Sequence, residues 1–166
     1  MLLHELIEQT AARLPEGDAL QFRDEVWSYR TLAAGVSSAA ARLAGLGLGR
    51  LERVALYLDK RFEFVTGAFG AAAAGGVFVP VNPVLKPAQV HHILTDCNVR
   101  ILVTTAGRLA GLGDVLADCP DLRHVICVDG VPEDIDLPGI DLRGWDELAD
   151  DGAPHAAIDT DMAAIL

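Results

Sequence analysis

Few residues in this sequence could bind phosphate, and they are far apart. The chain has only two lysines, Lys60 and Lys86, and one run that alternates glycine with leucine, Gly45 to Gly49. That run would fit a dinucleotide-binding turn only if it followed a strand and opened a helix. It follows a helical pattern and precedes an apolar run, so it predicts the end of a helix and a turn.

The other candidate groups do not form a catalytic pattern. His91 and His92 are adjacent, without the H-x-x-x-H spacing or the carboxylates that a metal site needs. Ser37 and Ser38 lack the G-x-S-x-G turn that exposes a hydrolase nucleophile. The five carboxylates of segment 129–141 lack the spacing of a calcium loop. We therefore expect these side chains to be solvated, to pack or to cap helices.

The segment 53–83 predicts a strand, a helix and a second strand parallel to the first. Val54 to Leu58 form a continuous apolar run, which is typical of a strand covered on both faces by helices. Apolar residues then fall at helical spacing, at Phe62, Val65, Phe69, Ala72 and Ala73. Gly75 and Gly76 end this helix, and residues 77–79 form the next strand.

This helix is built largely of small residues, which suggests that its backbone closely approaches a neighbouring element. Its internal glycines, Gly67 and Gly70, each cost about 1 kcal/mol of helix propensity, so packing must compensate. The 22 residues 64–85 carry no charge, long enough for a membrane span. Gly75-Gly76 and two prolines would break such a span, so we exclude it.

The rest of the chain repeats the alternation of strand and helix. Strands are predicted to start at Val54, Val77, Arg100 and His124, at separations of 23, 23 and 24 residues. This rhythm predicts an α/β fold, a parallel sheet with flanking helices and right-handed crossovers. Further expected elements are a first helix, a hairpin at 19–28, helices at 29–46, 87–96, 109–116 and 142–148, and a last apolar strand at 162–166.

Composition narrows the class of protein. The chain has 166 residues and a formal net charge of −11, and its 13 basic residues form no stripe. These values argue against nucleic acid and anionic membranes as partners. The N-terminus lacks the basic region of a signal peptide, so we expect a cytoplasmic protein. The three cysteines have no C-x-x-C spacing and are expected to be reduced thiols.

Several segments together resemble the N-terminal part of the AMP-forming adenylating enzymes, the acyl-CoA synthetases and ligases. The resemblance covers nearly the whole chain, through WSYRTL at 27–32, the strand 54–58 with Glu63-Phe64, AGGVFVPVNP at 74–83, and Ile93-Leu94 with ILVT at 101–104. The stretch 77–104 most resembles the subgroup of acyl-CoA ligases associated with exosortase systems.

The resemblance implies that residues 1–166 form an incomplete N-terminal domain. It divides into helix, hairpin and helix at 1–50, repeated βα units at 51–130, and an acidic loop with the start of a strand at 131–166. The complete enzyme would use ATP, Mg²⁺ and coenzyme A, but the family's phosphate-binding loop and later motifs are absent from these residues. The isolated chain is therefore expected to be inactive and to bind none of these cofactors.

The resemblance also implies one candidate contact and two kinds of partner. Family members often carry a basic residue after the Asn-Pro pair, where it meets a phosphate of coenzyme A. Here that position is Val84, and Lys86 could substitute for it, although an exposed lysine before a helix needs no such role. The partners would be the remainder of the ligase or a second copy. The alternative is a non-catalytic α/β module that binds a nucleotide or protein.

Overall fold

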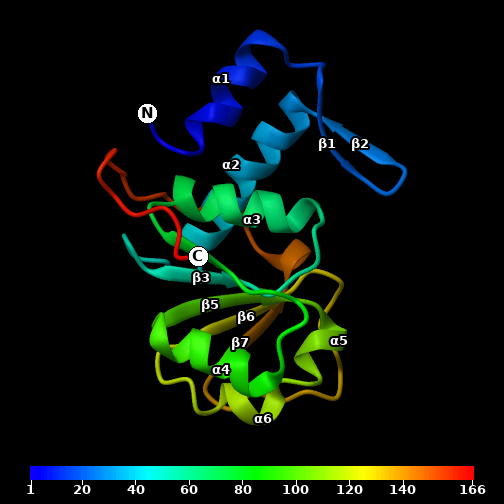
Figure 1. Cartoon of the computed structure of the whole chain (residues 1–166), viewed down its shortest axis with the longest axis vertical. Helices are drawn as coiled ribbons and strands as arrows, with labels where there is room; N and C mark the ends of the chain where they lie inside the picture. Colours follow the sequence, from blue (N-terminus) through cyan, green and yellow to red (C-terminus); the bar gives the residue numbers. More distant parts are fainter.

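The computed structural model describes all residues from 1 to 166 and has three layers (Figure 1). A parallel sheet contains β3 (Arg53–Leu56), β4 (Val77–Pro80), β5 (Val99–Thr104), β6 (His124–Cys127) and β7 (Asp141–Gly144), in the order β4-β3-β5-β6-β7. Every neighbouring pair in this sheet is parallel. The predicted α/β fold class is confirmed.

Helices cover both faces of the sheet (Figure 1). One layer contains α2 (Tyr29–Gly45) and α3 (Phe62–Ala73), and the opposite layer contains α4 (Pro87–Asp96), α5 (Ala106–Leu109) and α6 (Gly113–Leu116). Helix α1 (Glu5–Arg13) packs on α2, next to the antiparallel hairpin of β1 (Asp18–Phe22) and β2 (Glu25–Ser28). The predicted hairpin and first helix are thus confirmed.

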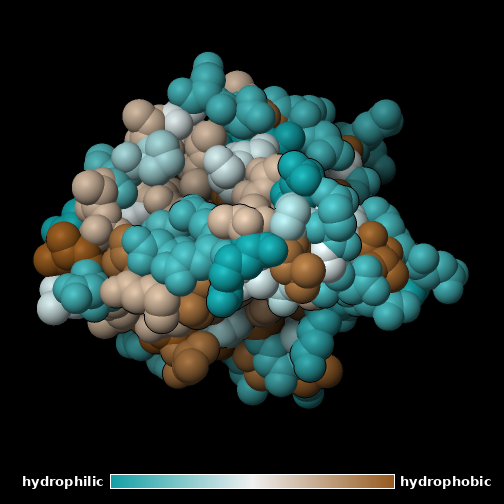
Figure 2. All heavy atoms as spheres, turned by 90° about the horizontal axis from the view of Figure 1, so that it is seen from above, coloured by the Kyte–Doolittle hydropathy of each residue, from teal (hydrophilic) through white to brown (hydrophobic).

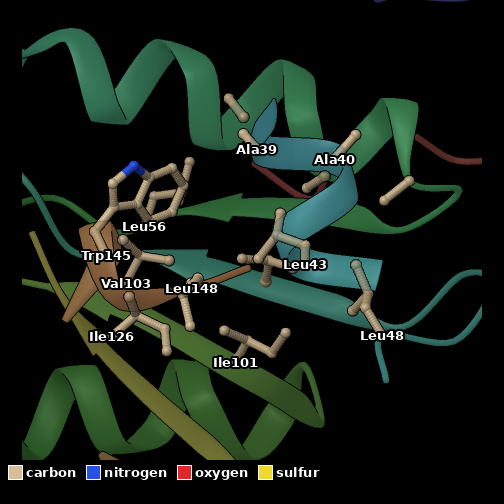
Figure 3. Close-up of a cluster of buried hydrophobic side chains, with 14 of the residues drawn as sticks. Ala39, Ala40, Leu43, Leu48, Leu56, Ile101, Val103, Ile126, Trp145 and Leu148 are labelled. Carbon is tan, nitrogen blue, oxygen red and sulfur yellow. The ribbon is translucent and has the colours of Figure 1, made fainter. Parts of the chain in front are cut away.

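The side chains of the central strands alternate between two cores. Val54 and Leu56 of β3 face α2 and α3, whereas Ala55 and Tyr57 face α4, α5 and α6, and all four are buried. In the first core, Leu43 of α2 lies over the sheet among residues such as Leu56 and Ile101 (Figure 3). Burial on both faces explains why β3 and β5 are continuous apolar runs.

Helix α2 is the element that the sequence predicted most closely. The Ser28 hydroxyl accepts a hydrogen bond from the Thr31 amide and caps the helix, as expected. Its predicted inner face is buried throughout: Leu32, Val36, Ala39, Ala40 and Leu43. The glycine run ends the helix, and Gly47 adopts a φ of 81°, so the prediction of a helix end and turn is confirmed.

Helix α3 confirms the predicted close approach but corrects the predicted buried face. A Cβ atom on Gly70 would lie 2.6 Å from the Ala39 Cβ, so α2 and α3 are in backbone contact there. Phe62 and Ala72 of the predicted face are buried, but most of the other buried positions of α3 are small residues. Val65 and Phe69 are only half-buried; Val65 packs with α1 and the hairpin, and Phe69 contacts this cluster and the main core. The helix turns its small side to the core because a large side chain would hold α2 away.

Two helices predicted for the C-terminal half need correction. The helix expected at 109–116 is two short helices, since Thr105 caps α5 early and the chain turns between Leu109 and Gly113. The helix expected at 142–148 is instead β7 followed by a single 3₁₀ turn, η1 (Trp145–Glu147). Residues 141–144, which form β7, pair with β6, and this pairing outweighs the local helical preference of the segment.

The last apolar strand is present only as the start of a ladder. Ala164 forms a parallel bridge with Phe78 of β4, and the Phe78 amide donates to the Ala163 carbonyl. Met162 is 56% exposed and Leu166 is fully exposed, so the prediction of a core strand at 162–166 is wrong in extent.

The three cysteines form no disulfide, which confirms the predicted free thiols. Cys119 and Cys127 are buried and Cys97 is half-buried. Burial raises the pKa of the Cys127 thiol to about 11, with a smaller contribution from Asp129. No helix in the structure is both long enough and apolar enough to cross a membrane.

Candidate functional site

The carboxyl edge of the parallel sheet is the first place to look for a site. In open α/β sheets, ligands bind outside the carboxyl ends of the strands, where successive connections run in opposite directions. Here β3 connects outward to β4, whereas β5 lies on the other side of β3 and connects away towards β6. The switch point therefore lies between the carboxyl ends of β3 and β5.

Arg108 occupies this switch point and joins the ends of three strands. Its Nη2 donates to the Asp59 Oδ1 at 2.8 Å, and its Nη1 donates to the Pro83 carbonyl at 2.7 Å. Its guanidinium carbon lies 5.1 Å from the centre of the Tyr57 ring, in a cation–π arrangement. Although partial burial lowers it, the pKa of Arg108 is raised overall by Asp59, so the residue is a permanent cation.

Tyr57 makes a second connection from β3 to the loop after β4. Its hydroxyl donates to the Leu85 carbonyl at 2.9 Å, and its own carbonyl accepts from the buried Thr104 hydroxyl at 3.1 Å. Within the loop, the Asn82 Oδ1 accepts from the Val84 amide at 3.1 Å. Arg108, Tyr57 and the Asn82 side chain thus hold the backbone of segment 82–86, although Val84 is 80% exposed.

Two further polar contacts lie along the same edge. The Asp129 Oδ1, after β6, accepts from the Ala106 amide at 2.8 Å, and Arg61 pairs with Glu63 at 2.6 Å. The pKa of Arg61 is raised, first by its hydrogen bonds to Glu63. Both arginines of this edge, Arg61 and Arg108, are thus already paired with carboxylates.

A pocket of ≈ 450 Å³ opens between the loops that follow β3 and β4. Its polar residues are Asp59, Lys60 and Asn82, and Phe64 of α3 is among its apolar residues. The Lys60 ammonium has no ion pair with any carboxylate of the structure. A pocket with this lining could accept a group that combines apolar surface with negative charge.

The predicted contact residue Lys86 lies at this same edge of the sheet. It is exposed, it precedes the first residue of α4, and its backbone amide donates to the Gln89 Oε1 at 3.0 Å. Its ammonium makes no hydrogen bond or ion pair within the chain, so the group faces solvent. Nothing in the structure tests whether it meets a phosphate, and that role stays a prediction.

The glycine-rich turns lie at the opposite edge. Gly45 to Gly49 precede β3 and Gly75-Gly76 precede β4, so both turns are at the amino ends of the strands. The residues present therefore do not form a backbone cradle for ATP phosphates at the carboxyl edge. No group of three or more His, Cys, Asp or Glu residues is arranged to hold a metal ion.

Sequence reasoning did not identify Arg108 as a site residue. The available signal was a basic residue four positions after the end of a buried strand, at the edge where α/β ligands bind. That signal is general, and it gives no indication that the side chain reaches back to Asp59 and Pro83. Only the strand order brings these loops together.

A doubly wound α/β layer with its polar groups at the carboxyl edge is typical of nucleotide-handling enzymes. A family model described as AMP-binding enzyme matches residues 7–166. The chain therefore belongs to the AMP-binding enzyme family. This finding confirms the resemblance to adenylate-forming enzymes, whereas the exosortase-associated subgroup is not shown.

Curated relatives include large synthases. The chain is 30% identical over 131 residues to bacitracin synthase 1 of Bacillus licheniformis, covering 78% of this chain and 2% of the synthase. It is 28% identical over 164 residues to tyrocidine synthase 2 of Brevibacillus parabrevis, covering 99% of this chain and 4% of that protein. The chain thus spans a small part of these relatives.

Solved structures with the same fold include CoA ligases. The anthranilate CoA ligase AuaEII, in complex with anthranoyl-AMP, superimposes with a TM-score of 0.76 at 25% identity, over 81% of this chain and 26% of that one. Coronafacic acid ligase from Pectobacterium brasiliense has a TM-score of 0.81 at 17% identity, over 98% and 31%. The second similarity shows the fold alone.

Proposed function

We propose that this chain is the N-terminal part of an AMP-forming acid–thiol ligase. In such an enzyme a carboxylate oxygen attacks the α-phosphorus of ATP and pyrophosphate leaves, and a thiolate then attacks the acyl carbon and AMP leaves. The observation that carries the proposal is the family match over residues 7–166. The adenylate bound to AuaEII supports the first half of this reaction.

Residues 1–166 contribute the sheet and its carboxyl edge to this enzyme, and we assign none of them to ATP or Mg²⁺. Negative charge on a transferring phosphoryl group requires backbone amides, cations or a metal aimed at it. The arginines at this edge are paired with Asp59 and Glu63. The phosphate-binding groups of the ligase would come from residues outside this range.

Coenzyme A is the thiol that we propose, with Lys86 as a contact for one of its phosphates. The support is the exposed, unpaired position of Lys86 in the loop whose first residues, Asn82 and Pro83, line the pocket, and the presence of CoA ligases among the structural neighbours. The resemblance of residues 77–104 to exosortase-associated ligases supports that subgroup within the family. The main competing proposal is an acceptor other than coenzyme A, because these curated relatives are named as synthases and not as CoA ligases.

The 166-residue chain is expected to show no acid-dependent exchange of pyrophosphate into ATP, because it has no phosphate cradle. The measurement compares pyrophosphate exchange by this chain with exchange by the polypeptide that the cell makes from the gene, here called the cellular product. Each is tested with a panel of aromatic, fatty and amino acids. Exchange by the cellular product alone supports the proposal.

Two results would contradict it. Exchange by the isolated chain would show that its carboxyl edge holds ATP after all. No exchange by the cellular product with any acid, together with binding of a nucleotide or protein, would favour the non-catalytic module.

The remainder of the ligase is the partner that we propose for the surface near the chain ends. A pocket of ≈ 280 Å³ there is lined mainly by apolar residues of segments 1–6 and 157–163. Met1, Ile158 and Met162 are each more than half exposed beside it. Figure 2 shows a group of hydrophobic side chains at the left rim, the side on which Figure 1 draws both chain ends.

Because this apolar surface is open, the isolated chain is expected to self-associate weakly at high concentration. Sedimentation velocity over a hundredfold concentration range measures this, and Met162→Glu should reduce the association. Leu14→Glu, which replaces a leucine that is 56% exposed but outside the pocket, is the matched control. A sedimentation coefficient that does not change with concentration would contradict the expectation.

A further inference from the structure

We infer that Arg108 is a positioning residue that fixes the loop 82–86 and thereby the direction in which Lys86 presents its charge. The inference rests on the proposed function, because it concerns the anion that Lys86 would meet. Arg108 does not touch Lys86 in the structure. It acts on the loop that leads to it, through the Pro83 carbonyl and through Asp59.

The geometry around the loop supports this role. The loop is held by two backbone carbonyls, one bonded to Arg108 and the other, at Leu85, bonded to the Tyr57 hydroxyl. The Arg108 guanidinium also lies over the Tyr57 ring, so the two donors support each other. Tyr57 directly follows the buried strand β3, and Arg108 lies on α5, which follows the buried strand β5. The core therefore holds both donors in place.

The residues on either side of Leu85 are exposed, and one of them, Lys86, is the only free cation of the loop. Val84 is 80% exposed and Lys86 is exposed, so no packing from other elements holds their side chains. Without the two carbonyl contacts, the backbone would rely on the Asn82 turn and on the start of α4. A fixed backbone lowers the entropy lost when a flexible lysine binds a ligand.

The chemistry suits an arginine and not a lysine at this position. A planar guanidinium can donate in two directions at once and still stack on an aromatic ring, whereas an ammonium is a compact point charge. Asp59 is needed as a counter-ion because the Arg108 side chain is only 22% exposed. This arrangement suits a ligand that carries a phosphate group on a larger molecule, and part of that molecule would enter the adjoining pocket.

Hydrogen exchange in the 166-residue chain tests the positioning role directly. In Arg108→Met the amides of Val84 and Leu85 should exchange about tenfold faster than in wild type, because each 1.4 kcal/mol of lost support is a factor of ten. Arg108→Lys should give a smaller increase, and Tyr57→Phe should also accelerate the Leu85 amide. The matched control is Arg61→Met, which removes a paired arginine at the same edge without a contact to this loop.

Wild-type exchange rates at Val84 and Leu85 in Arg108→Met would overturn the inference. So would an equal acceleration at the β5 amides, which would mean that Arg108 only stabilises the whole fold. This readout does not depend on any enzyme activity, so it is separate from the proposed function.

The second test measures the steady-state kinetics of the cellular product, with coenzyme A as the probe. Arg108→Met and Lys86→Gln should each raise KM for coenzyme A about tenfold, more than they lower kcat, and the double variant should be no worse than Lys86→Gln. Additive effects would overturn the coupling between the two residues. An unchanged KM in Lys86→Gln would overturn the phosphate contact of the proposed function, while the exchange rates would still decide the role of Arg108.

Discussion

Replacing Gly70 by valine is expected to destabilise the chain by roughly 3 kcal/mol, a large part of the stability of a domain of this size. A Cβ at this position would lie 2.6 Å from the Ala39 Cβ and 3.1 Å from the Ala40 amide nitrogen. These atoms belong to the α2 backbone or are fixed to it, so they cannot move aside as a flexible side chain could. The two helices must separate, and the core beneath them must open.

Urea unfolding at neutral pH measures the effect, and two variants control for the change of residue type. Gly107→Ala places a methyl group where no atom lies within 4 Å, so it should be neutral or slightly stabilising. Gly67→Ala meets only the end of the Leu56 side chain, at 3.0 Å, and should cost less than Gly70→Ala. In Gly70→Ala, the further change Ala39→Gly should recover part of the loss. Unfolding of Gly70→Val at the wild-type midpoint would show that α2 and α3 are not in backbone contact.

This contact also shows why sequence patterns predicted the core only partly. Helical spacing correctly placed α3, and the abundance of small residues correctly indicated a close neighbour. The large residue Val65 nevertheless packs with α1 and the hairpin and not in the main core, and Phe69 contacts both clusters. A hydrophobicity pattern marks which residues avoid water, but it cannot distinguish two apolar surfaces on one helix.

The missed strand β7 has a different cause. Residues 141–144 are short and contain charged side chains, so they have no pattern of their own that favours a strand. They become one because the edge of β6 offers free backbone groups, with His124 opposite Asp141 and Cys127 opposite Gly144. The charged contacts at the start of this pair include His124 and Arg143, both bonded to Asp141. Such pairing is decided by tertiary contacts, which a local pattern does not contain.

The candidate site was the least predictable part of the molecule. The position of Lys86 after β4 follows from the alternation of strands and helices, and the structure places it at the expected edge. Its relation to Arg108 depends on β4 and β5 lying on opposite sides of β3. Sequence spacing gives parallel strands, but it does not give their order across the sheet.

A second group of charges, at the amino edge, holds the starts of β3, β5 and the segment before β6 together. The Arg100 Nε donates to the Glu52 Oε1 at 2.9 Å, and its Nη1 donates to the Asp121 Oδ1 at 2.5 Å. The other oxygen of Glu52 accepts from the Gly49 amide at 2.8 Å. The side chains of Glu52 and Arg100 are 20% and 23% exposed, so this pair is largely shielded from water.

Arg100→Met is therefore expected to cost roughly 2 kcal/mol at neutral pH, less than the loss of a partner in a fully buried pair because water still reaches both groups. The variant leaves the Glu52 carboxylate half-buried with only the Gly49 amide and the more distant Arg123 beside it. Arg143→Met, which removes an exposed arginine also paired with an aspartate, is the control and should change the free energy of unfolding by less than about 0.5 kcal/mol.

The difference between wild type and Arg100→Met should also depend on pH in a defined direction. Burial by itself would raise the pKa of Glu52, but the Gly49 amide and Arg100 outweigh it and hold the pKa below its ordinary value. A carboxyl group whose pKa is lowered by folding stabilises the protein above the pKa of the unfolded state and loses this contribution as the pH falls through the folded value. The difference should thus be constant near neutral pH and shrink below about pH 4.5, the ordinary range of a glutamate. Urea unfolding of both proteins from pH 7 to pH 3.5 measures it, and a difference that stays constant or grows in acid would mean that Arg100 stabilises the fold through packing and not through its ion pairs with Glu52 and Asp121.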